Sequence, residues 1–254
     1  MHNNPHLKFS DVFDIYLSAC SNKQELTDTL RDLLYPYKGR SILDCSVGTG
    51  FATLDLIKEG FDIVCADGSS QMLEKFSENA QRLKVDTRPI VMKWEELGRT
   101  FRGVFDVVIC RGNSLVYADM WDTERAENTA STIERSLSSM YHCTRNGGIL
   151  YIDIPSSSSL ETGETLSIRH PTVDINNIQI SVAENIKILS DKKTRKWDVS
   201  MSIGGRPLEF TRYSHVINEE ELTKSLLSIG FKDIKRLKSG GHRDHYQAFL
   251  ARKI

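Results

Sequence analysis

Asp44-Cys45-Ser46-Val47-Gly48-Thr49-Gly50 stands between a short apolar run, residues 41–45, and an amphipathic stretch, residues 51–59. Glycine lets the backbone turn sharply and approach a ligand closely, and the first N–H groups of a helix have no partner within it. The segment therefore predicts a strand, a tight ligand-binding turn and a helix. We expect a side chain at Gly48 or Gly50 to fill the space of the ligand.

A second signal follows in the next apolar run, which ends at Asp67. A carboxylate at a strand end, about 20 residues beyond a glycine turn, is typical of the ribose-binding acid of nucleoside-binding folds. Taken alone, Asp67 is equally compatible with a helix cap or a turn residue. Beside the glycine turn, it favours a nucleoside ligand.

Apolar runs and amphipathic stretches alternate as far as Asp153. The predicted strands are 41–45, 62–66, 89–92, 105–110 and 148–152, and the predicted helices are 27–34, 51–59, 70–83 and 123–141. This alternation indicates a parallel sheet with helices on both faces. The continuous apolar character of the strands suits burial from both sides.

The pattern changes after a serine run at 156–159. Four stretches alternate without helices between them, at 165–168, 178–189, 195–203 and 208–217. They predict an antiparallel meander with a tight turn at Gly204-Gly205. A helix at 219–228 and strands at 231–237 and 247–252, joined through Gly240-Gly241, then return to the main sheet. We therefore divide the chain into an N-terminal helical lid (1–40), a core (41–155 and 218–254) and an antiparallel insertion (156–217) that covers an acceptor site.

The composition is that of a folded soluble protein, with 254 residues, 39% hydrophobic and 26% charged. A formal net charge of −1 gives no general attraction to nucleic acid or to a membrane surface, so neither partner is expected. The N-terminus lacks the pattern of a signal peptide. The five cysteines are scattered without a C-x-x-C pair, which predicts reduced thiols, a cytoplasmic location and no metal site. Assembly of the chain into a homo-oligomer is compatible with these features.

The glycine segment resembles the S-adenosylmethionine (SAM) loop of class I methyltransferases, an acidic residue followed by G-x-G-x-G, with Ser46 in place of the first glycine. A dinucleotide-binding loop would need a further glycine where Ala52-Thr53 stand. The resemblance implies a Rossmann-like class I methyltransferase fold, an α/β fold with a mostly parallel seven-stranded sheet, helices on both faces and the inserted antiparallel cover. It also implies SAM as cofactor and S-adenosylhomocysteine as product.

The same resemblance implies a set of cofactor-binding residues. Met72 and Trp94 would border the adenine, whereas Lys93 departs from the acidic or amide residue usual at its position. The implied cofactor set is Tyr16, Asp44, Ser46, Gly48, Gly50, Asp67, Gly68, Met72, Lys93, Trp94, Glu95, Cys110 and Arg111.

The segment Cys110-Arg111-Gly112-Asn113-Ser114 is similar to the C-x-G-N-S stretch of glycine and sarcosine N-methyltransferases, and the framework 42–153 also resembles those enzymes. They place an arginine shortly after the fifth strand, where this chain has Pro155. The resemblance therefore supports the cofactor and the reaction more strongly than it supports glycine as the acceptor.

A small-molecule acceptor is expected near the end of the fourth strand, the insertion and the C-terminal hairpin. The candidate substrate-binding residues are Asn113, Ser114, Tyr117, Arg169, Arg212, Tyr213 and Tyr246. His242, His245 and then His215 are the candidate general bases, because histidine titrates near neutral pH. Each of these cationic side chains is also compatible with a solvated surface position.

Three functions follow from these residues. The favoured one is N-methylation of an amine or an amino-acid-like small molecule. The second is O- or C-methylation of a secondary-metabolism intermediate, and the third is SAM binding without catalysis. Because the sulfonium of SAM is already an activated methyl donor, alignment of the acceptor and exclusion of water are the main requirements.

Overall fold

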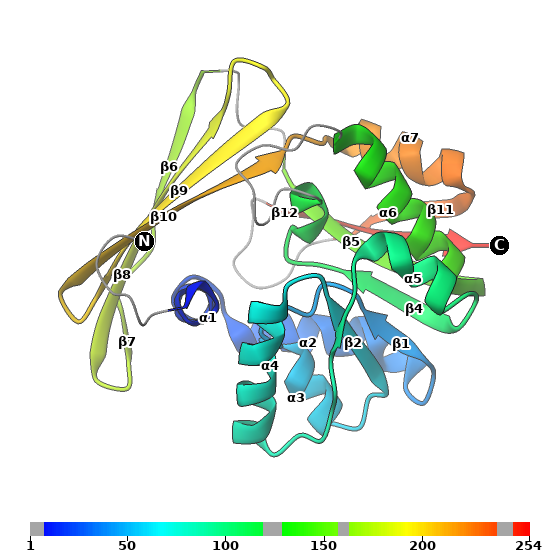
Figure 1. Ribbon diagram of the computed structural model, residues 1–254, viewed down its shortest axis with the longest axis horizontal. Coiled ribbons are helices and arrows are strands. Elements are labelled where there is room, and N and C mark those ends of the chain that lie inside the picture. The colour runs from blue at the N-terminus through cyan, green and yellow to red at the C-terminus, as the bar shows by residue number, and fades with distance from the viewer. Residues whose placement is uncertain (1–7, 119–128, 157–162, 238–245) are drawn as a thin grey trace.

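The computed structural model describes residues 8–118, 129–156, 163–237 and 246–254. A seven-stranded sheet with helices on both faces forms the larger part, and a five-stranded sheet stands beside it (Figure 1). The main sheet has the order β11-β12-β5-β4-β1-β2-β3. Its strands are β1 (Ile42–Asp44), β2 (Ile63–Asp67), β3 (Ile90–Val91), β4 (Phe105–Cys110), β5 (Thr144–Pro155), β11 (Phe231–Leu237) and β12 (Tyr246–Lys253).

The direction of the strands confirms the predicted class I fold. Strands β1 to β5 pair in parallel, and β12 runs antiparallel to both β5 and β11. Side chains in β4 alternate between the two faces of the sheet, because Val107 and Ile109 belong to one buried cluster and Val108 to the other. This burial on both faces explains the continuous apolar runs in the sequence.

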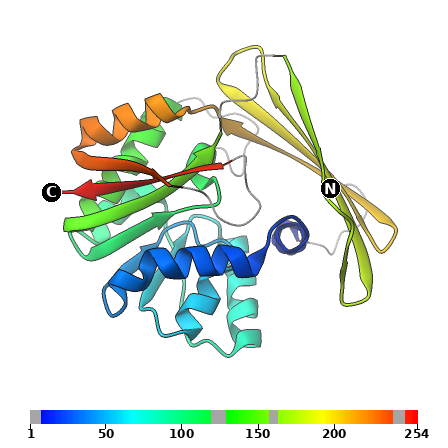
Figure 2. The same cartoon turned by 180° about the vertical axis from the view of Figure 1, so that it is seen from behind.

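Helices cover both faces of this sheet (Figures 1 and 2). One face carries α2 (Lys23–Leu34), α3 (Thr53–Lys58) and α4 (Ser70–Leu83), and the other carries α5 (Trp94–Thr100), α6 (Thr129–Cys143) and α7 (Glu219–Ile229). Two 3-10 turns, η1 (Tyr35–Tyr37) and η2 (Ser114–Tyr117), complete this part. Helix α5 was not predicted, because Leu97 is its one buried residue and leaves no periodic pattern to detect. Within the described ranges, no helix has the length and hydropathy required to cross a membrane.

The second sheet is the antiparallel insertion predicted from the sequence. Its strands are β6 (Thr165–Arg169), β7 (Val173–Ile175), β8 (Ile178–Ile188), β9 (Thr194–Ile203) and β10 (Arg206–His215). Their order is β10-β9-β8-β6, with β7 also paired to β8. The turn between β9 and β10 places Gly204 and Gly205 at φ +57° and +81°, as a tight hairpin turn requires. The short strand β7 was not predicted.

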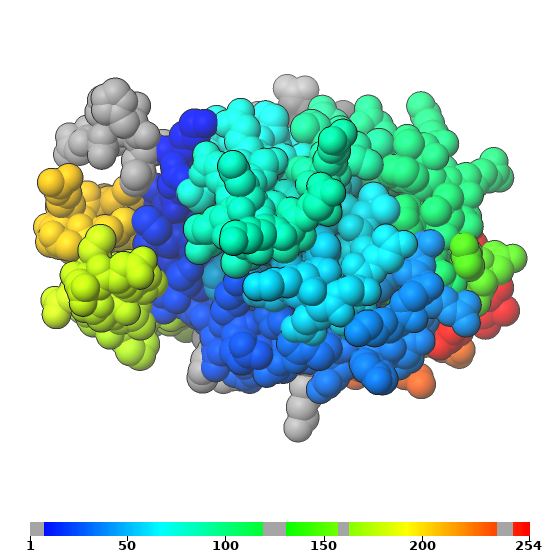
Figure 3. All heavy atoms as spheres, turned by 90° about the horizontal axis from the view of Figure 1, so that it is seen from below, coloured from blue at the N-terminus to red at the C-terminus, as the bar shows by residue number. Residues whose placement is uncertain are grey.

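Helix α1 (Phe9–Cys20) lies between the two sheets, and Figure 3 shows these N-terminal residues in blue between the second sheet and the core. On one side, Thr49 of the glycine turn donates a hydrogen bond to Asp14 over 2.7 Å. On the other side, the ring of Phe9 packs edge-on against Phe210 of β10, with centroids 5.2 Å apart. The helix therefore contacts both the core around the main sheet and the second sheet.

Gly98 provides a test of the contact between α5 and α6. A Cβ at this position would lie 2.9 Å from both the Ser139 carbonyl oxygen and the His142 Cβ. Helix propensity alone predicts that Gly98→Ala stabilises the protein by about 0.5–1 kcal/mol. We expect the opposite sign, a loss of roughly 1–3 kcal/mol in urea unfolding, because the backbone of α6 must move.

The exposed Arg99 on the same helix provides the control. Arg99→Ala should change the free energy of unfolding by less than about 0.5 kcal/mol. A stabilised Gly98→Ala protein would show that α5 and α6 are not packed as closely as described.

Candidate active site

A cavity of about 770 Å³ opens at the carboxyl ends of the parallel strands. Its floor consists of the loops that follow β1, β2, β3 and β4, including Gly48, Asp67, Trp94 and Asn113. The opposite wall comes from helix α1, from β9 of the second sheet and from the start of β12. Open α/β sheets bind ligands at this edge, so the topology alone makes this cavity the candidate site.

Most of the predicted site residues meet in this cavity. The residues that line it are Tyr16, Ser46, Gly48, Asp67, Gly68, Met72, Lys93, Trp94, Glu95, Arg111, Asn113, Ser114, Tyr117 and Tyr246. Cofactor and acceptor candidates therefore share one continuous space.

Seven of the predicted residues that the structure describes do not line the cavity, namely Asp44, Gly50, Cys110, Arg169, Arg212, Tyr213 and His215. Arg169 and Tyr213 fall on the face of the second sheet opposite to Arg195 and Glu184, as the strand registers show. The Arg212 guanidinium lies 3.8 Å from the centre of the Phe9 ring. His242 and His245 lie outside the described residues.

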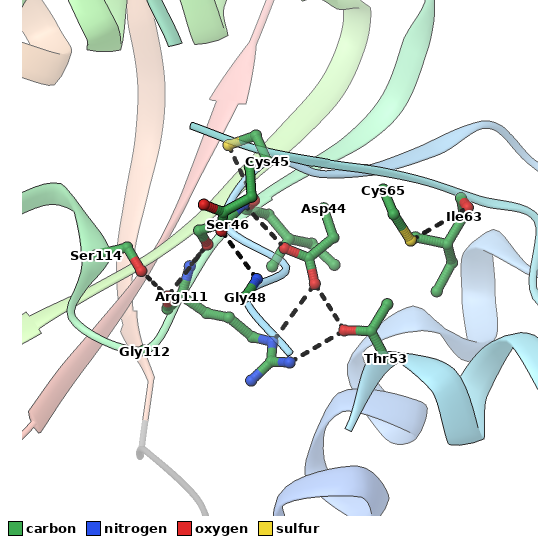
Figure 4. Close-up of polar contacts among 12 residues, drawn as sticks. Asp44, Cys45, Ser46, Gly48, Thr53, Ile63, Cys65, Arg111, Gly112 and Ser114 are labelled. Carbon is green, nitrogen blue, oxygen red and sulfur yellow. Dashed lines mark hydrogen bonds and ion pairs between the residues drawn. The ribbon is translucent and has the colours of Figure 1, made fainter. Parts of the chain in front are cut away.

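Ser46 ties the two central loops together. Its hydroxyl accepts a hydrogen bond from the Arg111 backbone N–H over 2.8 Å and donates one to the Arg111 carbonyl over 3.1 Å (Figure 4). The Ser114 hydroxyl donates to the same carbonyl over 2.7 Å. A glycine at position 46 could not form this link, which gives a physical reason for the departure from the usual loop sequence.

Asp44 lies beneath the loop and supports it. Its carboxylate is fully buried and accepts hydrogen bonds from the Thr53 hydroxyl over 2.7 Å and from the Ser46 N–H over 3.2 Å. The guanidinium of Arg111 turns back toward this pair, with its Nε 3.6 Å from Asp44 and its Nη2 3.0 Å from the Thr53 hydroxyl (Figure 4). Asp44 and the Arg111 side chain thus hold the shape of the turn.

The two glycines of the turn have different roles. A Cβ on Gly48 would meet no atom within 4 Å, whereas a Cβ on Gly50 would lie 2.7 Å from Phe76 and 2.8 Å from Leu54. The expectation that both glycines leave space for a ligand is therefore wrong for Gly50, which allows α4 and α3 to pack against the turn. Both have positive φ, +55° and +78° respectively.

Asp67 and Trp94 are held in fixed positions. The Asp67 carboxylate accepts hydrogen bonds from the N–H groups of Gly48 and Ser69, each over 2.9 Å. A carboxylate offers about four lone-pair sites, so Asp67 can still accept from hydroxyl groups of a ligand. The Trp94 indole donates to the Cys45 carbonyl over 2.6 Å, which fixes the plane of its ring against the cavity.

The loop after β4 has a strained backbone that Asp153 stabilises. Gly112 and Asn113 both have positive φ, +76° and +63°, and both donate backbone hydrogen bonds to the Asp153 carboxylate at the end of β5. Asn113 is only 2% exposed, and its Oδ1 has no hydrogen-bond partner among the described residues. A buried acceptor of this kind is a group that a ligand donor would satisfy.

Burial also keeps the nearby phenol and thiols protonated. It raises the pKa of Tyr117 to about 12, although the positive charge of Arg195 opposes the shift. Burial raises the pKa of the Cys143 thiol to about 12, and it raises the pKa values of Cys45 and Cys65 as well. These cysteines therefore act as small apolar residues and not as nucleophiles.

Several residues of the site were not predicted, chiefly Asp14, Thr49, Glu184, Arg195 and Trp197. Glu184 of β8 accepts hydrogen bonds from the Tyr16 hydroxyl over 3.0 Å and from the Trp197 indole over 2.6 Å. The alternation of buried positions in β9 is the one sequence signal for Arg195 and Trp197.

Cys20, His170 and Glu184 also lie together, with their potential ligand atoms within 4.8 Å of one another. The sequence spacing of these three residues gave no indication of this cluster. His170 Nε2 contacts Glu184 Oε1 at 2.5 Å, so the carboxylate binds the residue that follows β6 as well as Tyr16 of helix α1.

Comparison with known proteins agrees with this geometry. A family model described as a methyltransferase domain matches residues 42–148. The chain is similar to the glycine/sarcosine N-methyltransferase of Parasynechococcus marenigrum (strain WH8102), with 33% identity over 145 residues, which cover 57% of this chain and 48% of that protein. It is 27% identical over 154 residues to the glycine N-methyltransferase of Homo sapiens, covering 56% and 50%. The chain therefore spans about half the length of the curated relatives it matches.

Solved structures match nearly the whole chain. DesVI from Streptomyces venezuelae superposes with a TM-score of 0.75 at 16% identity, covering 98% of this chain and 100% of that one. CalS10, an amino pentose methyltransferase from Micromonospora echinaspora, gives a TM-score of 0.73 at 13% identity and covers 100% of both chains. At these identities the likeness concerns the fold, and it includes the second sheet. The match to the methyltransferase domain model is confined to residues 42–148, and the fold around them is shared with solved methyltransferases such as CalS10.

Proposed function

We propose that this protein is a SAM-dependent methyltransferase that acts on a small molecule, and that the reaction is N-methylation of an amine. The observation that carries the proposal is the single cavity, which joins the glycine turn and Asp67 at one end to the unsatisfied Asn113 amide at the other. The names of the relatives, glycine/sarcosine N-methyltransferases, and of neighbours such as the sugar N-methyltransferase KedS8 support an amine as acceptor.

The residues present fit SAM. Asp67 would accept hydrogen bonds from the ribose hydroxyls, Met72 and Trp94 would border the adenine, and the open space above Gly48 would admit the ligand close to the backbone. SAM supplies an activated methyl group on a positively charged sulfur. Beyond binding it, this chain has to align the acceptor and keep water out.

The acceptor end of the cavity suits a neutral amine. Asn113 Oδ1 can accept a hydrogen bond from an amine N–H and so direct the lone pair, and Tyr117 remains a neutral phenol. Among the described residues that line the cavity there is no histidine to deprotonate a hydroxyl. A neutral amine already has a free lone pair and needs no such base before attack, which favours N-methylation over O- or C-methylation.

We further propose that residues 1–40 form the lid and that the insertion, 156–217, covers the acceptor site on the core formed by 41–155 and 218–254. Phe13 and Tyr16 of α1 and Trp197 of β9 support this proposal, because they line the cavity opposite the loops of the core. Their aromatic surfaces would exclude water from the reacting groups.

The first test is whether wild-type protein binds SAM and S-adenosylhomocysteine in calorimetric titrations. Asp67→Asn should weaken both by roughly 1–3 kcal/mol, because a charged acceptor to the ribose becomes neutral. The exposed Asp62, just before the same strand, provides the control, and Asp62→Asn should bind normally. A wild-type protein without affinity for either compound would refute the proposed function.

The two glycines of the turn give a second test. Gly48→Ala should lower SAM affinity at least about tenfold and cost roughly 1–2 kcal/mol of stability for its left-handed backbone. Gly50→Ala should unfold far more readily without any ligand, by roughly 3 kcal/mol or more, because overpacking adds to the same backbone cost. Equal losses of stability in urea unfolding would contradict the different roles assigned to these glycines.

A third test addresses Asn113 with labelled SAM and libraries of amines and alcohols. Asn113→Gly keeps the positive φ that glycine adopts freely and removes only the amide. It should lower kcat/KM for the amine substrate at least about tenfold, while the Kd for SAM changes by less than about threefold. Asn176→Gly is the matched control, because Asn176 also has a positive φ, +54°, in the exposed turn between β7 and β8. Methylation of alcohols alone would exclude the N-methyltransferase assignment.

A further inference from the structure

Arg195 reaches the cavity from the second sheet. It lies in β9 two residues before Trp197, so both side chains are on the same face of the sheet, and both line the cavity. The side chain is almost completely buried, with 9% of the residue exposed. Its direct neighbours across the strands are Ile188 and Ser214, neither of which carries a charge.

Arg195 differs from the other two arginines that line the cavity. Arg135 forms an ion pair with Glu95 over 2.7 Å, and Arg111 faces Asp44 over 3.6 Å. In the described part of the chain, no carboxylate lies within 4.0 Å of the Arg195 guanidinium, and its Nη1 has no hydrogen-bond partner. A buried guanidinium without a counterion costs several kcal/mol, because the lost hydration is not replaced.

Neighbouring polar groups do not neutralise this charge. Glu184, the acidic residue on the same face of the sheet, is bound to Tyr16, Trp197 and His170. The Tyr117 hydroxyl hydrogen bonds with Arg195, but burial raises the pKa of this phenol, so it stays neutral and brings no negative charge to the guanidinium. Among the described residues, no carboxylate therefore neutralises this positive charge, and we infer that it is available to a ligand in the cavity.

We propose that Arg195 binds an oxyanionic group of the methyl acceptor, a carboxylate or a phosphate, while Asn113 receives the amine. This inference rests on the proposed N-methyltransferase function and narrows its substrate class. Asn113 precedes η2, and Tyr117, which interacts electrostatically with Arg195, ends it. A 3-10 helix rises about 2 Å per residue, so the Cα atoms of Asn113 and Tyr117, four residues apart, are on the order of 8 Å apart. The acceptor would accordingly carry its amine and its anionic group a few bonds apart.

The experiment uses matched sets of amines and labelled SAM. Each set contains an amino carboxylate, the corresponding phosphate ester and a neutral analogue. Glycine, O-phosphoethanolamine and ethanolamine form the smallest set, and further sets have longer or aromatic side chains. We expect wild-type protein to methylate anionic members at least about tenfold more efficiently than neutral ones. The preference between carboxylates and phosphates identifies which oxyanion the site takes.

Arg195→Gln should lower kcat/KM for the anionic members at least about tenfold, by the factor of the wild-type preference, and so bring it close to that for the neutral members, because the desolvated charge pair is lost. Arg195→Lys should recover part of the activity, since it restores the charge without the planar fork. The Kd for SAM should stay within about twofold in both variants. Arg206→Gln, an exposed arginine of β10, is the matched control and should behave as wild type.

Stability separates a binding role from a structural one. Without ligand, Arg195→Gln should unfold at the same temperature as wild type or at a higher one, because it removes an uncompensated buried charge. Equal turnover of neutral and anionic members, unchanged activity of Arg195→Gln, or a SAM-binding protein that methylates no anionic member would overturn the inference. Failure to bind SAM at all would instead overturn the proposed function.

Discussion

The buried carboxylate of Asp44 is the group on which the site depends. A fully buried charge is tolerated only where hydrogen bonds and counter-charges replace its hydration. Here those partners are the Ser46 N–H, the Thr53 hydroxyl and the Arg111 guanidinium. They come from the start of the glycine turn, from the helix after it and from the end of β4. One carboxylate thus fixes the relative positions of three segments.

Ser46 extends this constraint from the buried layer to the cavity surface. Its paired hydrogen bonds with the Arg111 backbone make the loops after β1 and β4 a single unit. Asp153 then anchors the next residues, Gly112 and Asn113, in backbone conformations that these loops would not adopt alone. The loops after β1 and β4 are therefore held in fixed relative positions, which is what the proposed in-line transfer between two bound molecules would require.

The sequence predicted the parts of the fold that depend on local patterns. Strand β4 and helix α4 were placed correctly, because β4 is a continuous apolar run and α4 has apolar residues at helical spacing. Strand β11 was also placed correctly, after Gly230 ends the preceding helix. Ser46, Gly48 and Asp67 could be identified because the turn and the strand end are recognisable within one segment. Asp14 and Glu184 could not, since their importance arises from contacts with Thr49 and Trp197 on other elements.

The second sheet shows why alternation alone is insufficient. Four of its five strands were predicted, but the face that each side chain occupies depends on how the sheet docks on the core, and a shift by one residue exchanges the two faces. Arg169 and Tyr213 therefore point away from the core although they were candidates for the site, whereas Arg195 points toward it. The role of Gly50 was missed for a related reason, because only the packing of Phe76 and Leu54 reveals it.

Glu184 links the second sheet to helix α1, which lies against the glycine turn of the core. Burial alone would raise the pKa of its carboxyl. The hydrogen bonds with His170 and Trp197 lower this pKa by more than burial raises it, so the net shift is downward and the group stays ionised. Lifting helix α1 would remove the Tyr16 hydroxyl from this buried charge, which costs more than the loss of a neutral hydrogen bond. Since Tyr16 also lines the cavity, the same side chain contacts both the cavity and the second sheet. Helix α1, the second sheet and this wall of the cavity are consequently coupled through one carboxylate, as the loops of the floor are through Asp44.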